Sequence, residues 1–401
     1  MAIIRNKHLL NHLPHVYEMK DMLEFCEEHD EVYIYGCAEE QEYLLKFFDI
    51  CGVKITGYVV SDIENSREDF CYRSLPVNDV KSVISDEGVG IILGLPEKYY
   101  GQIIPWFREV GFTDYFQLTG HSLIGIAEQL KPREKDEMTF EISLADHCNL
   151  ACQMCDHFSQ LSEPWFVDKD VFTREIREMA RIYDHEVAAI TLVGGEPTLH
   201  PDLFELMKIT REEFSDAQII VLTNGVKLLE LEHSSNGNFW EICKENRISV
   251  TVTVYPIKLD YIAIEEKAKE YGVGVSMSSN IHADKATKKP KISDKHTMDP
   301  KGKVPKCEFM HCLYFNKFNV VKDGKYYMCP VEAHIDILNK RFGVDFNYVE
   351  GDCLELDKVK DWRELAEFSS NRIPFCGYCD QAHWGHDSVW KPSAKKIEEY
   401  I

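Results

Sequence analysis

The segment Cys148-Asn149-Leu150-Ala151-Cys152-Gln153-Met154-Cys155 carries three cysteines with the spacing C-x3-C-x2-C. It comes shortly after Thr139–Leu144, a run that reads as a buried strand. A closed [4Fe-4S] cluster needs four ligands, so three thiolates on one tight loop leave one iron open, much as catalytic zinc sites keep one position free. The segment therefore predicts a metal centre that can still bind a small molecule.

A second motif, Val193-Gly194-Gly195-Glu196-Pro197, ends another predicted strand, Ala188–Val193. Glycines let backbone groups approach a bound amino acid, and Glu196 can accept a hydrogen bond from its ammonium group. Together the two motifs resemble the radical S-adenosylmethionine superfamily, and the resemblance implies that the open iron binds S-adenosylmethionine through its amino and carboxylate groups. It also implies that an electron from the reduced cluster breaks a sulfonium bond, which gives methionine and a 5′-deoxyadenosyl radical.

Zinc is the main alternative for the three cysteines, because His147 and His157 are close by in the sequence and could complete a tetrahedral site. The spacing alone does not decide between the two metals. A zinc site needs no Gly-Gly-Glu-Pro motif at a neighbouring strand end, so the context favours the iron-sulfur cluster.

Through C-x3-C-x2-C, Gly-Gly-Glu-Pro and a series of βα units, the chain resembles the radical S-adenosylmethionine superfamily. The resemblance implies that Met154 lies beside the adenine, that Gly194, Gly195, Glu196 and Pro197 contact the methionine moiety, and that Thr223 and Asn224 in Leu222-Thr-Asn-Gly end a strand at the cofactor site. The runs Cys152-Gln-Met-Cys-Asp-His-Phe-Ser, Thr223-Asn-Gly and Thr253-Val-Tyr-Pro also resemble a subgroup found in bacterial surface-glycan gene clusters.

Outward from the cysteine loop, strand-like runs alternate with helical patterns, and this alternation predicts a parallel sheet. The expected strands are Thr139–Leu144, Ala188–Val193, Ala217–Leu222, Ile248–Val254 and Gly272–Met277, with a helix over Phe172–Tyr183. Chemistry in barrels of this kind lies at the carboxyl ends of the strands, where the cysteine loop falls. We therefore expect residues 136–305 to form a partial (β/α)6 radical SAM barrel.

Residues 1–135 are expected to form a separate Rossmann-like α/β domain that ends in a polar linker at residues 128–138. Its predicted elements are strands at 32–36, 55–60, 89–93 and 116–118 and helices at 39–50 and 99–110. Dinucleotide binding is disfavoured, because the first turn, Gly36-Cys37-Ala38-Glu39-Glu40, lacks G-x-G-x-x-G and places two acids at a helix N-terminus. A structural or partner-recognition role fits this domain better.

The remaining cysteines resemble the Twitch form of an auxiliary-cluster domain, expected at residues 306–401. Cys312, Gly324 and Cys329 read C-x11-G-x4-C, and Cys376-Gly-Tyr-Cys379 adds a C-x2-C pair. By this resemblance Cys312, Cys329, Cys376 and Cys379 hold one auxiliary [4Fe-4S] cluster, and too few cysteines are left for a second one. Asp323-Gly324 is a hairpin signal in its own right. A zinc ribbon is the alternative to this cluster. Cys307 could replace Cys312 as a ligand. Cys353 and Cys243 are either buried thiols or hydrogen-atom donors.

Composition limits the partners and the location of the protein. Its 401 residues carry a net charge of -23, which opposes binding to nucleic acid or anionic lipid. The N-terminus lacks an apolar signal core, and nowhere does an apolar run reach the length of a membrane span. We therefore expect a cytoplasmic protein in which the 14 cysteines stay reduced and serve metal binding.

The expected reaction is hydrogen abstraction from a small-molecule substrate, a phosphorylated or nucleotide-linked sugar, with a flavodoxin- or ferredoxin-type reductant. The lysine-rich segment 284–306 is either a solvated linker or a phosphate clamp. An auxiliary cluster that accepts an electron would give dehydrogenation, whereas a thiol donor, Cys353 or Cys243, would give epimerisation. Asp156 is a candidate acid or base, with His157 beside it. A peptide maturase and a non-enzymatic iron-sulfur or zinc protein are the alternatives.

Overall fold

The computed structural model describes residues 16–36, 38–61, 75–278, 297–381 and 390–401. The chain divides into two units, each described here by itself. The first contains Met1–Lys131 and Pro305–Leu313, and the second contains Pro132–Val304 and Tyr314–Ile401.

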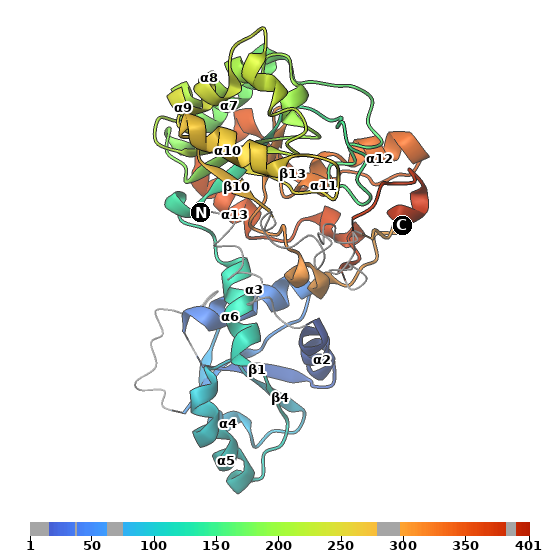
Figure 1. Cartoon of the computed structure of the whole chain (residues 1–401). Helices are drawn as coiled ribbons and strands as arrows, with labels where there is room; N and C mark the ends of the chain where they lie inside the picture. Colours follow the sequence, from blue (N-terminus) through green and yellow to red (C-terminus); the bar gives the residue numbers. More distant parts are fainter. Residues whose placement is uncertain (1–15, 37, 62–74, 279–296, 382–389) are drawn as a thin grey trace. The chain divides into compact units, whose positions relative to one another are not determined.

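The first unit is built on a parallel five-stranded sheet with the strand order β3-β2-β1-β4-β5 (Figure 1). Its strands are β1 (Glu31–Tyr35), β2 (Gly57–Val60), β3 (Val77–Asp79), β4 (Val89–Leu93) and β5 (Tyr115–Gln117). Its helices are α2 (Val16–Glu27), α3 (Glu39–Cys51), α4 (Val80–Val83), α5 (Tyr100–Val110) and α6 (Gly120–Leu130), together with the 3-10 helices η4 (Glu97–Tyr99) and η8 (Lys306–His311).

This unit has the expected alternation of strands and helices on a parallel sheet. The sequence did not predict β3, because Val-Asn-Asp is too short and too polar to read as a strand. At α3 the first turn carries Glu39, Glu40 and Glu42, and the Gln41 side chain accepts the Ala38 N–H at 2.7 Å. A helix end with three carboxylates repels a pyrophosphate, which agrees with the absence of a dinucleotide fingerprint.

The second unit contains an eight-stranded sheet with the order β10-β9-β8-β7-β6-β11-β12-β13. Its strands are β6 (Thr139–Ser143), β7 (Ala189–Val193), β8 (Gln218–Thr223), β9 (Ile248–Val252), β10 (Val275–Met277), β11 (Val320–Lys322), β12 (Lys325–Tyr327) and β13 (Cys353–Glu355). The strands from β10 to β11 in this order run parallel, and β12 and β13 are antiparallel to their neighbours.

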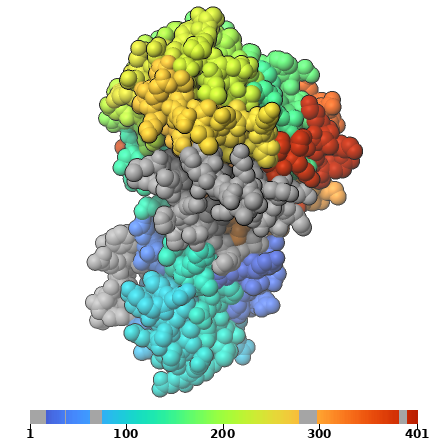
Figure 2. Space-filling model, viewed as in Figure 1, coloured from blue at the N-terminus to red at the C-terminus, as the bar shows by residue number. Residues whose placement is uncertain are grey.

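One face of this sheet is covered by α7 (Lys169–Tyr183), α8 (Leu203–Glu213), α9 (Phe239–Glu245), α10 (Tyr261–Tyr271) and α13 (Trp362–Ser369), whose apolar residues share one hydrophobic core with the strands. The helices α11 (Pro330–Ala333) and α12 (Ile335–Phe342) follow β12; Ala333 of α11 packs with Val320 and Tyr327 in a separate cluster, and Pro330 of α11 lines the cavity described below. Figure 2 shows α8, α9 and α10 as the yellow-green to orange-yellow surface of the unit. Because side chains alternate along a strand, Phe140 and Ile142 of β6 join the hydrophobic core, whereas Glu141 and Ser143 face the opposite side of the sheet.

The hairpin predicted at Asp323-Gly324 is present between β11 and β12. Both turn residues have positive φ angles, 51° and 72°, as a tight two-residue hairpin turn requires. β11 pairs with β6, so the chain after residue 313 continues the sheet formed by the strands of the expected barrel. The three domains expected at 1–135, 136–305 and 306–401 stay a prediction.

Two further expectations concern the connecting segments. The linker expected at 128–138 begins inside α6 and includes the 3-10 helix η5 (Lys135–Glu137). Most of the lysine-rich segment lies at 279–296, outside the described residues. Within the described part of the chain, helices of the length and apolarity needed to cross a bilayer are absent.

Candidate active site

A cavity of about 480 Å³ lies at the carboxyl ends of the parallel strands of the second unit. This volume falls in the range of about 300–1,000 Å³ that is usual for small-molecule sites. Its wall contains residues of the predicted site, namely Cys148, Cys152, Met154, Cys155, Asp156, Gly194, Gly195, Glu196, Thr223 and Asn224. Residues without a sequence motif also line it, among them Glu141, Tyr314, Phe318, Pro330 and Trp390. The structure thus brings three separate motifs to one cavity.

The three cysteines of the loop after β6 all face this cavity, and backbone and amide N–H groups are directed at one of them. The Leu150 N–H donates to Cys148 Sγ at 3.3 Å, and Asn224 Nδ2 donates to the same sulfur at 3.5 Å. Hydrogen bonds of this kind stabilise cluster thiolates and tune their redox potential. The donor set therefore fits a [4Fe-4S] cluster with three protein ligands.

Burial opposes ionisation of these thiols when no metal is bound. It raises the pKa of Cys148 and of Cys155 to about 12, and Asp156 adds to the effect on Cys155. Burial also raises the pKa of Cys152, although the side chains of Trp390 and Tyr255 partly oppose this. Metal binding must therefore displace protons, as is usual for thiolate ligands.

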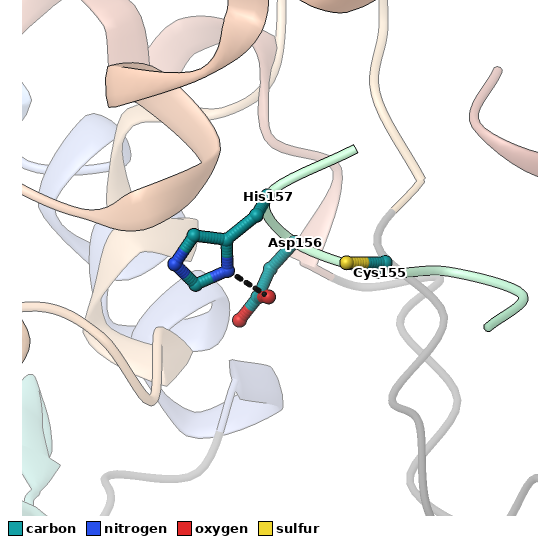
Figure 3. Close-up of side chains that lie close together, drawn as sticks. All are labelled: Cys155, Asp156 and His157. Carbon is teal, nitrogen blue, oxygen red and sulfur yellow. Dashed lines mark hydrogen bonds and ion pairs between the residues drawn. The ribbon is translucent and has the colours of Figure 1, made fainter. Parts of the chain in front are cut away.

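The zinc alternative has weaker support than the cluster. His147 Nδ1 accepts the N–H of Trp165 at 3.2 Å, and His147 does not line the cavity. The ligand atoms of Cys155, Asp156 and His157 lie within 4.8 Å of one another (Figure 3), so a single metal ion could bind there. Metal analysis distinguishes this site from a cluster at the three cysteines.

Gly194 and Gly195 pack directly against the backbone that leads into the cysteine loop. The Gly195 N–H donates to the Ala145 carbonyl at 2.7 Å. A Cβ atom on Gly194 would lie 2.4 Å from that carbonyl oxygen, and one on Gly195 would lie 2.1 Å from the His147 carbonyl oxygen. From the sequence, these glycines are expected to contact a bound amino acid. The structure gives them a packing role as well, because any larger residue would displace the cysteine loop.

Glu196 is a buried carboxylate that joins two motifs. It accepts hydrogen bonds from the Thr198 N–H at 3.0 Å, the Thr223 hydroxyl at 2.6 Å and the Asn224 N–H at 2.8 Å, as well as from the Thr198 hydroxyl. Burial raises its pKa, and these hydrogen bonds oppose the rise. We expected Glu196 to accept from the ammonium of a bound amino acid, but in the structure donors of the chain itself occupy its carboxylate.

Asn224 links the end of β8 to the cysteine loop. Besides its contact with Cys148, its Nδ2 donates to Asn149 Oδ1 at 2.7 Å. Met154, the residue expected beside adenine, lines the cavity with a positive φ of 61°. Pro197 begins the 3-10 helix η6 (Pro197–Leu199) behind Glu196 and is buried outside the cavity wall.

Asp156 and His157 form a pair on the cavity wall. His157 Nδ1–H donates to Asp156 Oδ1 at 2.8 Å (Figure 3), and the Tyr314 hydroxyl donates to Asp156 Oδ2 at 2.9 Å. Both oxygens of Asp156 are therefore engaged by side chains. Asp156 therefore orients His157, and this role fits the structure at least as well as a role as acid or base.

The two thiols considered as hydrogen-atom donors lie away from the cavity wall. Cys243 in α9 has an exposed fraction of 0% and belongs to the hydrophobic core between the helices and the sheet. Cys353 begins β13, where it pairs with Tyr327. Neither lines the cavity, so the structure does not bring either predicted donor to the site.

The four cysteines expected to hold the auxiliary cluster are divided between the two units. Cys329 directly precedes α11, Cys376 lies in the 3-10 helix η10 (Pro374–Tyr378) and Cys379 directly follows it; all three belong to the second unit. Cys312 directly follows η8 in the first unit, in the same short segment as Cys307. The auxiliary cluster therefore stays a prediction from the sequence.

The comparisons with known proteins agree with the motifs. Residues 142–285 match the family model described as the Radical SAM superfamily. Molybdenum cofactor biosynthesis protein 1 of Bos taurus is 36% identical over 92 residues, which is 22% of this chain and 14% of that protein. The 7,8-dihydro-6-hydroxymethylpterin dimethyltransferase of Methanocaldococcus jannaschii is 32% identical over 130 residues, 31% of this chain and 22% of that protein. The chain thus spans less than a quarter of either relative.

Two solved structures show a weaker likeness. BtrN in complex with AdoMet and 2-DOIA is 17% identical, with 60% of this chain and 84% of that chain covered and a TM-score of 0.37. SuiB of Streptococcus suis bound to the precursor peptide SuiA is 14% identical, with 70% and 74% covered and a TM-score of 0.25. Scores this low support no assignment of function.

Proposed function

We propose, from the radical SAM superfamily match of residues 142–285, that this protein is a radical S-adenosylmethionine enzyme. Cys148, Cys152 and Cys155 would hold its cluster, and S-adenosylmethionine would bind in the cavity at the strand ends. The observation that carries the proposal is the convergence of the cysteine loop, the Gly-Gly-Glu-Pro motif and Thr223-Asn224 on that cavity. Glu196 and Asn224 hydrogen-bond these motifs together.

When bound, the cluster and S-adenosylmethionine would supply an electron and a 5′-deoxyadenosyl radical. The chain's own residues would bind and orient these groups. The Leu150 and Asn224 N–H groups would hold the Cys148 sulfur in place. Tyr255 and Trp390, whose ring centroids lie 5.7 Å apart, would cover Cys152 and limit the access of water.

For the substrate, we propose a small sugar-like molecule, free or carried on a nucleotide. Polar side chains on the cavity wall can bind hydroxyl groups, among them Glu141, Asp156, His157, Thr253 and Tyr314. The lysines expected to clamp a phosphate lie largely outside the described residues, so the nucleotide part rests on the sequence alone. A peptide maturase is the alternative, and a panel of substrates tests both.

Dehydrogenation is favoured over epimerisation. Epimerisation needs a hydrogen-atom donor at the substrate, and neither Cys243 nor Cys353 lines the cavity. In dehydrogenation an alcohol loses a hydrogen atom to the radical, then a proton and an electron, and becomes a ketone. The electron needs a one-electron acceptor, a role that the predicted auxiliary [4Fe-4S] cluster would suit. A flavodoxin- or ferredoxin-type protein would supply the first electron.

The test uses anaerobically reconstituted enzyme with S-adenosylmethionine and dithionite in deuterated water. Nucleotide sugars and amino sugars form one panel, and ribosomal peptides form the second. A sugar that raises 5′-deoxyadenosine and gives a product lighter by two hydrogens supports the proposal. A single solvent deuterium in the product indicates epimerisation instead. Stimulation by peptides alone would refute the sugar assignment.

The auxiliary cluster has its own test. A variant in which Cys148, Cys152 and Cys155 are all alanine should retain about four irons per chain if a second [4Fe-4S] cluster exists. An iron content near zero in that variant would remove the auxiliary cluster from the proposal.

A further inference from the structure

Glu141 has an unusual environment for a carboxylate. Across the five parallel strands β6 to β10, it is the only charged residue. Its neighbours in β6, Phe140 and Ile142, point into the hydrophobic core, so the Glu141 side chain is on the cavity face of the sheet. The strand therefore places a single negative charge on the inner wall of the site.

No described residue satisfies this carboxylate. Its backbone N–H donates to the Asn319 carbonyl at 2.8 Å, which fixes β6 against β11. Within the described ranges, its side chain makes neither a hydrogen bond nor an ion pair. Burial raises the pKa of Glu141 to about 7, whereas the nearby His157 lowers it. A partly buried acid without a hydrogen-bond donor is costly, and such residues concentrate at functional sites.

A second polar group on the same wall also lacks a partner. His157 is 8% exposed, and its Nε2 atom has no hydrogen-bond partner among the described residues. Its Nδ1 is fixed by Asp156, which Tyr314 holds in turn. The ring of His157 is therefore oriented, with one nitrogen still available to a ligand at the cavity wall.

The charges on the wall restrict what this subsite can bind. Among the described residues that line the cavity, none is lysine or arginine. Lys322, a buried lysine of the same unit, is paired with Asp146 at 2.8 Å. Among these described lining residues, a phosphate or carboxylate near Glu141 would thus meet Glu141 and Asp156 without a compensating lysine or arginine. A hydroxyl or ammonium group, by contrast, can donate to Glu141.

We propose that Glu141 and His157 form the substrate subsite of this cavity, and that the subsite binds a hydroxyl or ammonium group of a polyol or amino sugar. The proposal rests on the proposed function and makes it more specific. The end of the substrate that enters the cavity carries no phosphate, and any nucleotide or phosphate lies at the other end. Glu141 is thus a specificity-determining residue that accepts a hydrogen bond from the substrate.

The test compares Glu141→Gln with Thr191→Val as a matched control. Glutamine keeps the shape of the side chain and removes its charge. Thr191 is the residue paired with Glu141 on the neighbouring strand β7, and it does not line the cavity. Both variants are first checked for iron content and for 5′-deoxyadenosine formed without substrate, which report on the cluster and on S-adenosylmethionine binding.

The probes are UDP-glucose, UDP-glucosamine, glucose 6-phosphate and a deoxyfluoro analogue of the best activator, because fluorine cannot donate a hydrogen bond. We expect Glu141→Gln to raise the KM of the activator about 10- to 100-fold, and substrate-free cleavage is measured separately as a report on the cluster. The penalty for the deoxyfluoro analogue at the recognised hydroxyl should be smaller in this variant, because a neutral amide oxygen accepts a weaker hydrogen bond than a carboxylate does. Thr191→Val should behave as wild type.

Three results would refute the proposed subsite. The first is an unchanged KM in Glu141→Gln, and the second is that glucose 6-phosphate stimulates 5′-deoxyadenosine formation more than the other compounds do. The third is that none of these compounds stimulates it in a wild-type enzyme that cleaves S-adenosylmethionine. A wild-type enzyme that cleaves no S-adenosylmethionine contradicts the proposed function itself, so the two failures are distinguishable. If only substrate-free cleavage falls in Glu141→Gln, the residue supports the cluster and the subsite is refuted.

Discussion

Replacement of Gly195 by alanine tests the packing of the Gly-Gly-Glu-Pro motif against the cysteine loop. The new Cβ would lie 2.1 Å from the His147 carbonyl oxygen and 2.4 Å from its carbon. Ordinary contact needs at least 3.4 Å, so the two backbones must separate by about 1 Å. His147 directly precedes Cys148, and its carbonyl also accepts the Glu196 N–H at 3.0 Å. The change therefore acts on the first cluster ligand.

The expected loss of stability in Gly195→Ala is the sum of two contributions. Overpacking of a filled site costs about 1–3 kcal/mol, and a lost buried hydrogen bond costs a similar amount, so Gly195→Ala should destabilise the unit by about 2–6 kcal/mol. A displacement of about 1 Å in a catalytic group can lower a rate by about 100-fold. We expect S-adenosylmethionine cleavage to fall by at least that factor, together with loss of iron from the loop.

The control is Gly274→Ala in the same unit. A Cβ there has its nearest heavy atom, Ser249 Cβ, at 3.7 Å, which is ordinary contact. Iron content, the electron paramagnetic resonance of the reduced cluster and 5′-deoxyadenosine formation are measured for both variants. Wild-type iron and wild-type cleavage in Gly195→Ala would refute the packing argument. Retained iron with weaker S-adenosylmethionine binding would show that Gly195 acts on the ligand instead.

Three further predictions concern other parts of the second unit. Glu175 accepts the Gly324 N–H at 2.6 Å, and burial raises its pKa from 4.5 to about 7. Protonated Glu175 therefore contributes stability to the fold that is fully present below pH 4.5 and is lost as the pH rises through 7. Glu175→Gln should therefore be more stable than wild type by about 1–3 kcal/mol at pH 8 but not at pH 4.5. Urea unfolding at both pH values measures the difference in the free energy of unfolding, and a difference that does not change with pH would contradict the prediction. Asn224→Ala removes an N–H donor from Cys148 Sγ, so the cluster should have a lower reduction potential and cleavage should fall about 10-fold, as a redox titration and a 5′-deoxyadenosine assay would measure. Cys243→Ala should keep full substrate turnover and lose about 1–2 kcal/mol of stability, since the thiol lies in the core. If the variant forms 5′-deoxyadenosine but no product, Cys243 is a hydrogen-atom donor after all.

The sequence predicted the parts of the fold that depend on local patterns. The strands β6, β7, β8 and β9 were found because each is an apolar run followed by a helix, and the cysteine loop was found from its spacing. The short strands were harder. β11 has three residues, and its place beside β6 depends on pairing between segments far apart in the chain.

In the candidate site, too, the residues of local motifs were predicted, and the contacts between distant segments were not. Cys148, Cys152 and Cys155 were predicted from one motif, and the structure places all three on the cavity. The role of Glu196 was not visible, because its donors come from both its own loop and the end of β8. Glu141 was missed because nothing in the run Thr-Phe-Glu-Ile-Ser marks it. Its importance comes from an environment made by His157, far away in sequence.

The central claim is tested most directly by measuring 5′-deoxyadenosine in wild type and in Cys148→Ala, after anaerobic reconstitution and addition of dithionite and S-adenosylmethionine. Metal analysis of the same samples identifies the bound ion. The account predicts 5′-deoxyadenosine from wild type, none above background from Cys148→Ala, and a difference of about four irons per chain between them. Stoichiometric zinc without iron, or equal 5′-deoxyadenosine from both proteins, would contradict it.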